Sequence, residues 1–176
     1  MIGRLLLPAL VGALCGCLTA DAAVVDRPRF AADGRLLRPE RVDRWVLVGT
    51  SLGQGYRDAT VEGPGMFHRV YLEPSAYDHF LETGRFPEGT MLALTIRRPE
   101  RRVPPSRTGW TEGEQVALEM SVKDRSRFPG GWAYFDFGSD ADSAAAIAPE
   151  RCAACHAEHA AIDNVFVQFY PQLRSR

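Results

Sequence analysis

The feature that most constrains this chain is a Cys-x-x-Cys-His motif near its end, formed by Cys152, Cys155 and His156. This spacing is the attachment signature of haem c. Two intervening residues let both sulfurs reach neighbouring vinyl groups of one porphyrin, and the adjacent histidine is delivered to the iron on the same side. We therefore expect one covalent haem c near the C-terminus, with His156 as the iron ligand.

A cysteine pair with this spacing has three other known uses besides haem attachment. A structural zinc site needs four ligands, and apart from the motif only His159 lies close by, with no second cysteine pair. A thioredoxin-like redox pair is expected in a βαβ context, which this pattern lacks. A simple disulfide between Cys152 and Cys155 is not excluded by the spacing alone.

The N-terminus is typical of an exported protein. A short basic start is followed by the uncharged apolar run Leu5–Leu18, and Ala20–Ala22 supplies small residues at the spacing of a signal-peptidase site. We expect residues 1–22 to be a signal peptide and the protein to be periplasmic or secreted. A lipoprotein signal ending before Cys17 is the alternative, with the protein anchored through a lipid on that cysteine. Cleavage after Ala22 would leave only the two cysteines of the haem motif.

Composition and periodicity predict one globular domain of the α+β class. The chain has 176 residues and a formal net charge of −1, which gives no electrostatic reason to expect nucleic acid as a partner. Residues 23–39 are expected to be an irregular arm, Pro74–Thr83 a helix that ends at Gly84, and 99–113 a basic surface loop. An antiparallel sheet of about five strands is expected from the segments Val46–Ser51, Phe67–Leu72, Thr90–Ile96, Gln115–Lys123 and Trp132–Phe137.

The second axial position of the iron would decide how a haem is used, because a strong sixth ligand favours electron transfer and an open position favours binding small molecules. His159 would leave the same helix face as His156, so we expect it at the surface. His68 could face the haem from a strand, whereas His79 is expected to be exposed. The remaining candidates, for which core packing is the more usual fate, are Met66, Met91 and Met120. No ligand stands out, so we expect a five-coordinate iron.

Several segments in a fixed order carry a resemblance to a known family. They are Trp45–Gly55, Phe67–Pro74, Thr83–Thr90, Val122–Asp124 followed by Phe128–Trp132, and Cys152–Pro171. In this order, and closing on the haem motif, they resemble the cytochrome P460 family over about residues 40–173, which we take as the haem domain. The resemblance implies an antiparallel sheet with flanking helices, a homodimer and a five-coordinate haem c. Some members oxidise hydroxylamine with a lysine-linked haem, while the cytochrome c′-beta members bind nitric oxide or carbon monoxide.

The lysines separate these two groups of members. The resemblance places the cross-linking lysine on the strand where this chain has Leu94, and the only lysine, Lys123, is expected to be solvated. Binding of nitric oxide or carbon monoxide, or another reaction of nitrogen oxides, is therefore the favoured function. The distal side is expected to contain Phe67 and Leu94, with Phe128 and Phe135 as further wall candidates.

Two alternatives stay open. One is an oxidoreductase that acts on hydroxylamine, peroxide or nitric oxide, which would need a proton-transfer group over the iron; the candidates are His68, Glu119 and Asp136. The other is a plain electron carrier with a redox partner protein.

Overall fold

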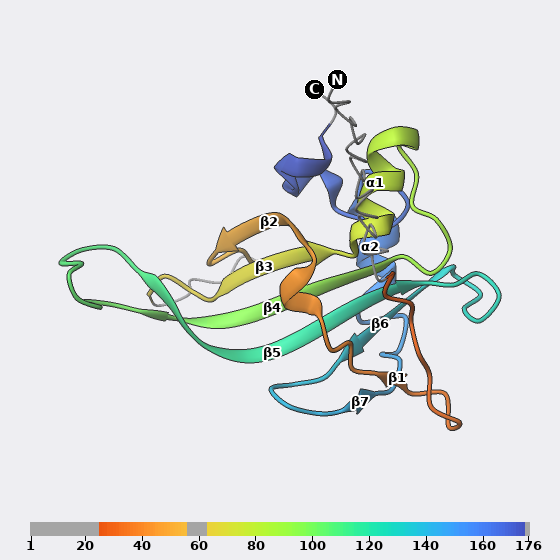
Figure 1. Ribbon diagram of the computed structural model, residues 1–176, viewed down its shortest axis with the longest axis horizontal. Helices are drawn as coiled ribbons and strands as arrows, with labels where there is room; N and C mark the ends of the chain where they lie inside the picture. The colour runs from red at the N-terminus through yellow and green to blue at the C-terminus, as the bar shows by residue number, and fades with distance from the viewer. Residues whose placement is uncertain (1–24, 56–62, 175–176) are drawn as a thin grey trace, which may run out of the picture.

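The computed structural model describes residues 25–55 and 63–174. The predicted signal peptide, residues 1–22, lies outside the described residues. The same holds for Cys17, the predicted site of lipidation. The centre of the structure is a five-stranded antiparallel sheet in which each strand pairs with its neighbour in sequence (Figure 1). The strands are β2 (Val46–Leu52), β3 (Phe67–Leu72), β4 (Met91–Glu100), β5 (Thr111–Lys123) and β6 (Trp132–Asp136). The predicted α+β class is confirmed.

The helix expected after β3 is present with the predicted bounds, as α1 (Pro74–Thr83). Pro74 occupies the first turn, where no backbone N–H is needed, and the Glu73 carboxylate accepts a hydrogen bond from the Ala76 backbone N–H. Gly84 ends the helix in the left-handed conformation, with φ of 68°. Phe80 is buried by this helix against Phe86, at 4.4 Å between ring centroids.

One face of the sheet is covered by the N-terminal arm, in which two residues form a short strand. Leu36 and Leu37 form β1 (Leu36–Leu37), which pairs with β7 (Ser143–Ala144), and Leu36 is fully buried. Figure 1 shows this small second sheet on the side of the large sheet opposite the helices. A short 3-10 helix, η1 (Val42–Arg44), then leads into β2. The core on this face contains Trp45, Met91, Ala93, Met120, Val122, Phe135 and Phe137.

The other face is covered by α1 and by the end of the chain, which lie together above the sheet in Figure 1. The C-terminal segment comprises α2 (Ala153–His159), η2 (Val167–Phe169) and η3 (Pro171–Leu173). Because side chains alternate along a strand, Leu72, Leu92 and Tyr134 point to this face. No helix among the described residues has the length and apolar character that crossing a bilayer requires.

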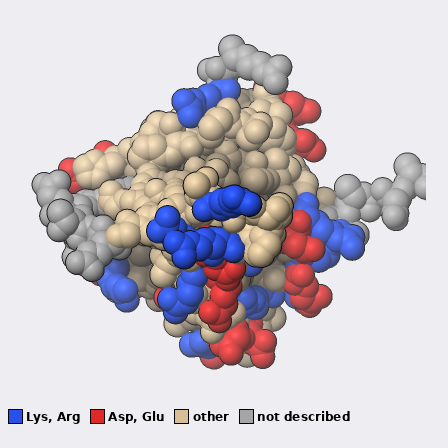
Figure 2. Space-filling model, turned by 90° about the vertical axis from the view of Figure 1, so that its left-hand side faces the viewer, with Lys and Arg blue, Asp and Glu red and all other residues tan. Residues whose placement is uncertain are grey.

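The β4–β5 hairpin is longer than predicted, and the expected surface loop 99–113 is correspondingly shorter. Proline removes a donor from a β ladder, but the register shifts between Arg97 and Pro99 accommodate it. The stem is also held by Arg69, whose Nε lies 2.6 Å from Oε2 of Glu112. Figure 2 looks onto the end of the molecule where this hairpin projects, and shows basic and acidic side chains next to one another there.

Candidate functional site

A large cavity lies between the sheet and the C-terminal segment. Its volume is about 270 Å³, and it is open to solvent. Strands β2 to β6 and Gln54 contribute to its wall, and the rest comes from residues between Ile147 and Tyr170. Gly49 lets the C-terminal segment approach β2 closely, since a Cβ at this position would lie 2.6 Å from Cδ1 of Tyr170.

The predicted haem-binding residues Cys152, Cys155 and His156 all line this one cavity. The short helix α2 brings them together, because Cys152 is its N-cap and its carbonyl accepts a hydrogen bond from the His156 backbone N–H at 3.1 Å. Both thiols are free and half-buried. Burial is also the main reason why the pKa of the Cys152 thiol is raised.

The His156 ring is held on three sides. Its centroid lies 4.4 Å from the Tyr134 ring and 4.6 Å from the Phe166 ring, and its Nδ1 lies 2.8 Å from the Asn164 carbonyl oxygen. A carbonyl can only accept a hydrogen bond, so Nδ1 carries the proton and Nε2 keeps the lone pair that binds a metal. Burial lowers the pKa of His156, which favours this neutral form.

These groups fit a haem of the c type. Two free thiols and a neutral imidazole border one cavity, as the attachment chemistry requires. The Tyr134 hydroxyl is buried beside them and has no hydrogen-bond partner among the described residues. A ligand bound in the cavity could supply that partner. The zinc alternative finds no support, since the described residues contain no group of three or more histidine, cysteine or acidic side chains placed to hold a metal ion.

The residues predicted for the far side of the haem are divided by the sheet. Leu94, His68 and Glu119 line the cavity. Phe67 does not, because it neighbours His68 on β3 and therefore points to the opposite face. Phe128 packs in the core on that opposite face, where its ring centroid lies 6.1 Å from that of Phe135.

Phe135 borders the cavity but is fully buried in the same opposite core. Among the other candidate iron ligands, Met91 and Met120 also belong to that core, and Met66 is not part of the cavity wall. His79 and His159 are exposed, as expected. Two of the predicted axial candidates thus border the cavity in the described structure: His68 lies on the cavity face of the sheet, and Met120 belongs to the opposite core.

The cavity wall includes titratable side chains, among them Glu119 and His68. Burial, and then the nearby Asp136 carboxylate, raise the pKa of Glu119, while Arg151 opposes the shift. Burial lowers the pKa of His68. Both shifts favour the uncharged form of the group. Asp136, the third candidate for proton transfer, is exposed.

The prediction that Lys123 is solvated is wrong. Its side chain is 4% exposed, and Nζ lies 2.6 Å from Oδ2 of Asp163 and 2.6 Å from the Phe86 carbonyl oxygen. Lys123 ends β5 and stands opposite Trp132, on the face covered by the C-terminal segment. A partner forty residues further along the chain neutralises its charge, which sequence position alone does not reveal. Lys123 is not part of the cavity wall.

Some residues of the site were missed from the sequence. Arg151, Gln54 and Tyr170 line the cavity, although none of them was among the predicted site residues. Asp163 and Asn164 had a usable signal, because an Asp-Asn pair between Ile162 and Val165 is typical of a two-residue β-turn.

A comparison with curated proteins gave no match. The model of the family described as cytochrome P460 matches residues 39–167, which covers most of the chain and includes the sheet, the cavity strands and the Cys-x-x-Cys-His motif. The family implies a haem cofactor, in keeping with the donor set at the cavity. The chain belongs to the cytochrome P460 family.

Proposed function

We propose that the protein is an exported cytochrome with one haem c, linked through Cys152 and Cys155 and bound at its iron by His156, that binds small neutral ligands such as nitric oxide or carbon monoxide. One observation carries the proposal: both thiols and the imidazole border one cavity, and the Asn164 carbonyl holds the imidazole in the tautomer that leaves Nε2 for a metal. A haem iron with one axial histidine supplies an open coordination position for such ligands.

The wall of the cavity supports a neutral ligand. Val70 and Leu94, which are paired across β3 and β4, give it an apolar part. Burial raises the pKa of Glu119 and lowers the pKa of His68, so both shifts act against a charged form of these two groups. No methionine belongs to the cavity wall apart from Met120, which is buried in the core on the other face.

A haem oxidoreductase is the second candidate, and Glu119 is the observation that favours it. A carboxyl with a raised pKa is suited to give or take a proton at a bound substrate. A lysine-linked haem of the hydroxylamine-oxidising type is not supported, since Lys123 is bound to Asp163 and Phe86 away from the cavity wall. An oxidoreductase of this chain would therefore work without that link.

The attachment is tested by changing one cysteine at a time. Cys152→Ala and Cys155→Ala should each lose part or all of the covalent haem that survives a denaturing gel. Ala154→Ser is the matched control, because Ala154 is exposed between the two cysteines on the same helix and should keep full haem staining. Full covalent haem in both cysteine variants would refute the cytochrome proposal.

The ligand is tested by the absorption spectrum of the ferrous holoprotein before and after carbon monoxide. The proposal expects a five-coordinate high-spin spectrum that changes fully on carbon monoxide binding. A low-spin spectrum insensitive to carbon monoxide would refute it and favour an electron carrier. His68→Ala would then show whether His68 is the sixth ligand, by turning that spectrum high-spin.

Hydroxylamine oxidation is tested on the same protein. Turnover of hydroxylamine that is lost in Glu119→Gln, while carbon monoxide binding is retained, would favour the oxidoreductase. Absence of turnover in the wild-type protein would leave the ligand-binding proposal standing.

Export and a homodimer complete the proposal. Export is supported by the pattern of residues 1–22, and the homodimer by family membership. Mass spectrometry of the mature protein from the producing cell would show cleavage after Ala22 or a lipid on Cys17. Light scattering of the purified holoprotein would give its oligomeric state, and a monomer at micromolar concentration would refute the dimer.

A further inference from the structure

The carbonyl that holds His156 belongs to an unusual turn. Asp163 and Asn164 both adopt positive φ, of 47° and 60°, and form the two central residues of a turn closed by backbone hydrogen bonds between Ile162 and Val165. Two successive left-handed residues define a type I′ turn, which Asp and Asn tolerate better than most residues. Such a turn is costly for residues with a Cβ, so its geometry depends on contacts made from outside it.

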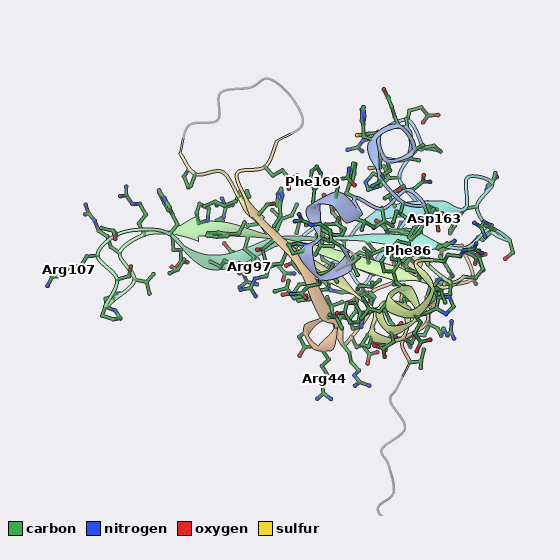
Figure 3. The ribbon with its side chains drawn as sticks, turned by 90° about the horizontal axis from the view of Figure 1, so that it is seen from above. Arg44, Phe86, Arg97, Arg107, Asp163 and Phe169 are labelled. Atoms are coloured by element: carbon green, nitrogen blue, oxygen red, sulfur yellow. The ribbon has the colours of Figure 1, made fainter. Side chains whose placement is uncertain are left out.

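Those contacts come from a part-buried cluster that we name the Asp163 anchor, made of Asp163, Lys123, Trp132 and the Phe86 carbonyl. The Asp163 carboxylate accepts hydrogen bonds from Lys123 Nζ at 2.6 Å and from Trp132 Nε1 at 3.2 Å. Lys123 Nζ also donates to the Phe86 carbonyl at 2.6 Å. Figure 3, which is seen from above, shows the labelled Asp163 and Phe86 close together. The anchor thus ties the turn to the ends of β5 and β6 and to the segment after α1.

The anchor and the haem ligand are joined through one residue. Asn164 follows Asp163 in the turn, and its carbonyl oxygen lies 2.8 Å from Nδ1 of His156. Hydrogen bonds to the outer nitrogen of a metal-bound histidine fix the orientation of the ring and raise its basicity, and losing such partners typically costs about 10- to 100-fold in metal affinity or activity.

We infer that Lys123, Asp163 and Trp132 are positioning residues that set the strength of the bond between His156 and the haem iron. The inference rests on the proposed haem attachment and goes beyond it. It gives the buried lysine a role on the side of the haem bound by His156, instead of a covalent link on the other side.

The test uses the holoprotein and resonance Raman spectroscopy of its ferrous form, which reports the stretching frequency of the iron–histidine bond. Asp163→Asn keeps a residue that tolerates positive φ, but removes the charge. Lys123→Met removes both of the hydrogen bonds made by Nζ. Both variants should show a broader band at lower frequency, with carbon monoxide affinity changed by about 10-fold, the lower end of the range for such outer partners.

Two further variants make the test decisive. Glu88→Gln is the matched control, because Glu88 forms an exposed ion pair with Arg125 near the same strand end and does not touch the Asp163 anchor. Its band should equal that of the wild type. Trp132→Phe removes only one hydrogen bond of the anchor and decides the matter if the two charge variants do not fold.

The possible outcomes separate the two proposals. Variants of the anchor that fold, carry covalent haem and keep the wild-type band would overturn the positioning role and leave the haem proposal intact. A wild-type protein without covalent haem would overturn the proposed function itself.

Discussion

Removing Lys123 and removing Asp163 from their ion pair should destabilise the protein by different amounts. The Lys123 side chain is 4% exposed and the Asp163 side chain 29% exposed. Removing one member of a buried pair is costly because the other charge stays desolvated without its partner. The deeper charge is the lysine, so losing Asp163 should cost more than losing Lys123.

Magnitudes follow from what each variant leaves behind. Breaking a fully buried pair costs about 3–5 kcal/mol, and this pair is part-buried because the Asp163 side chain is 29% exposed. Asp163→Asn keeps an acceptor for the ammonium, so we expect the lower end, about 3 kcal/mol of unfolding free energy. Lys123→Met leaves a carboxylate that reaches water and keeps the Trp132 N–H, but it deprives the Phe86 carbonyl of its donor. One lost hydrogen bond of this kind costs about 1.5 kcal/mol.

The two changes should not add. Lys123→Met combined with Asp163→Asn leaves no buried charge, so the double variant should cost about 2 kcal/mol less than the sum of the single variants. Guanidinium chloride unfolding of the holoprotein, followed by far-UV circular dichroism at pH 7, measures all four free energies. The dependence on denaturant should keep its slope, because the surface exposed on unfolding is the same.

Two results would refute this reasoning. One is a larger loss for Lys123→Met than for Asp163→Asn, which would mean that the carboxylate is the less solvated partner. The other is strict additivity, which would mean that the two groups do not stabilise each other. Glu88→Gln should change the unfolding free energy by no more than about 0.5 kcal/mol, as expected for an exposed pair.

Three further predictions test other parts of the structure. Gly49→Ala should destabilise the protein by about 1–3 kcal/mol in denaturant unfolding, because its Cβ would lie 2.6 Å from Tyr170 Cδ1. Leu36→Ala should cost about 3 kcal/mol by the same measurement, since this residue of the arm is fully buried in the sheet core. Glu119→Gln should be more stable than the wild type at pH 8 and lose that advantage towards pH 4. The folded state raises the pKa of Glu119, so it binds the proton more tightly than the unfolded chain, and wild-type stability falls as pH rises.

Each of these predictions has a control or a contrary result. A Cβ added at Gly55 would have no atom of the described residues within 4 Å, so Gly55→Ala should leave stability unchanged. An unchanged stability for Leu36→Ala would show that the arm does not contribute to the core. Parallel stability curves for wild type and Glu119→Gln between pH 4 and pH 8 would contradict the raised pKa.

Local signals in the sequence were sufficient for most of the fold. The helix Pro74–Thr83 could be predicted because its start and its stop are both encoded by single residues, Pro74 and Gly84. Strands with one buried face, such as Phe67–Leu72, were visible from alternation. The pairing of Leu36 with Ala144 could not be predicted, because no local pattern connects two segments so far apart in the chain.

The same distinction holds for the site. Cys152, Cys155 and His156 were predictable because their chemistry requires a fixed local spacing. Phe67 was expected on the distal side, yet its neighbour His68 faces the cavity, and adjacent residues of a strand cannot share a face. The burial of Lys123 depends on its ion pair with Asp163. This pair forms only when the C-terminal segment folds onto the sheet, so local sequence does not reveal it.

The polarity of the cavity is what separates the proposed functions. Glu119 and His68 in the wall first suggest proton chemistry. Burial, however, raises the pKa of Glu119 and lowers the pKa of His68, and both shifts favour the uncharged form of the group. The apolar part of the wall, formed by Val70 and Leu94, favours a neutral diatomic ligand over a charged one, because it offers no compensating charge. A protonated Glu119 could still donate one hydrogen bond, so the pH dependence of ligand affinity in Glu119→Gln would tell a binding role of this carboxyl from a purely structural one.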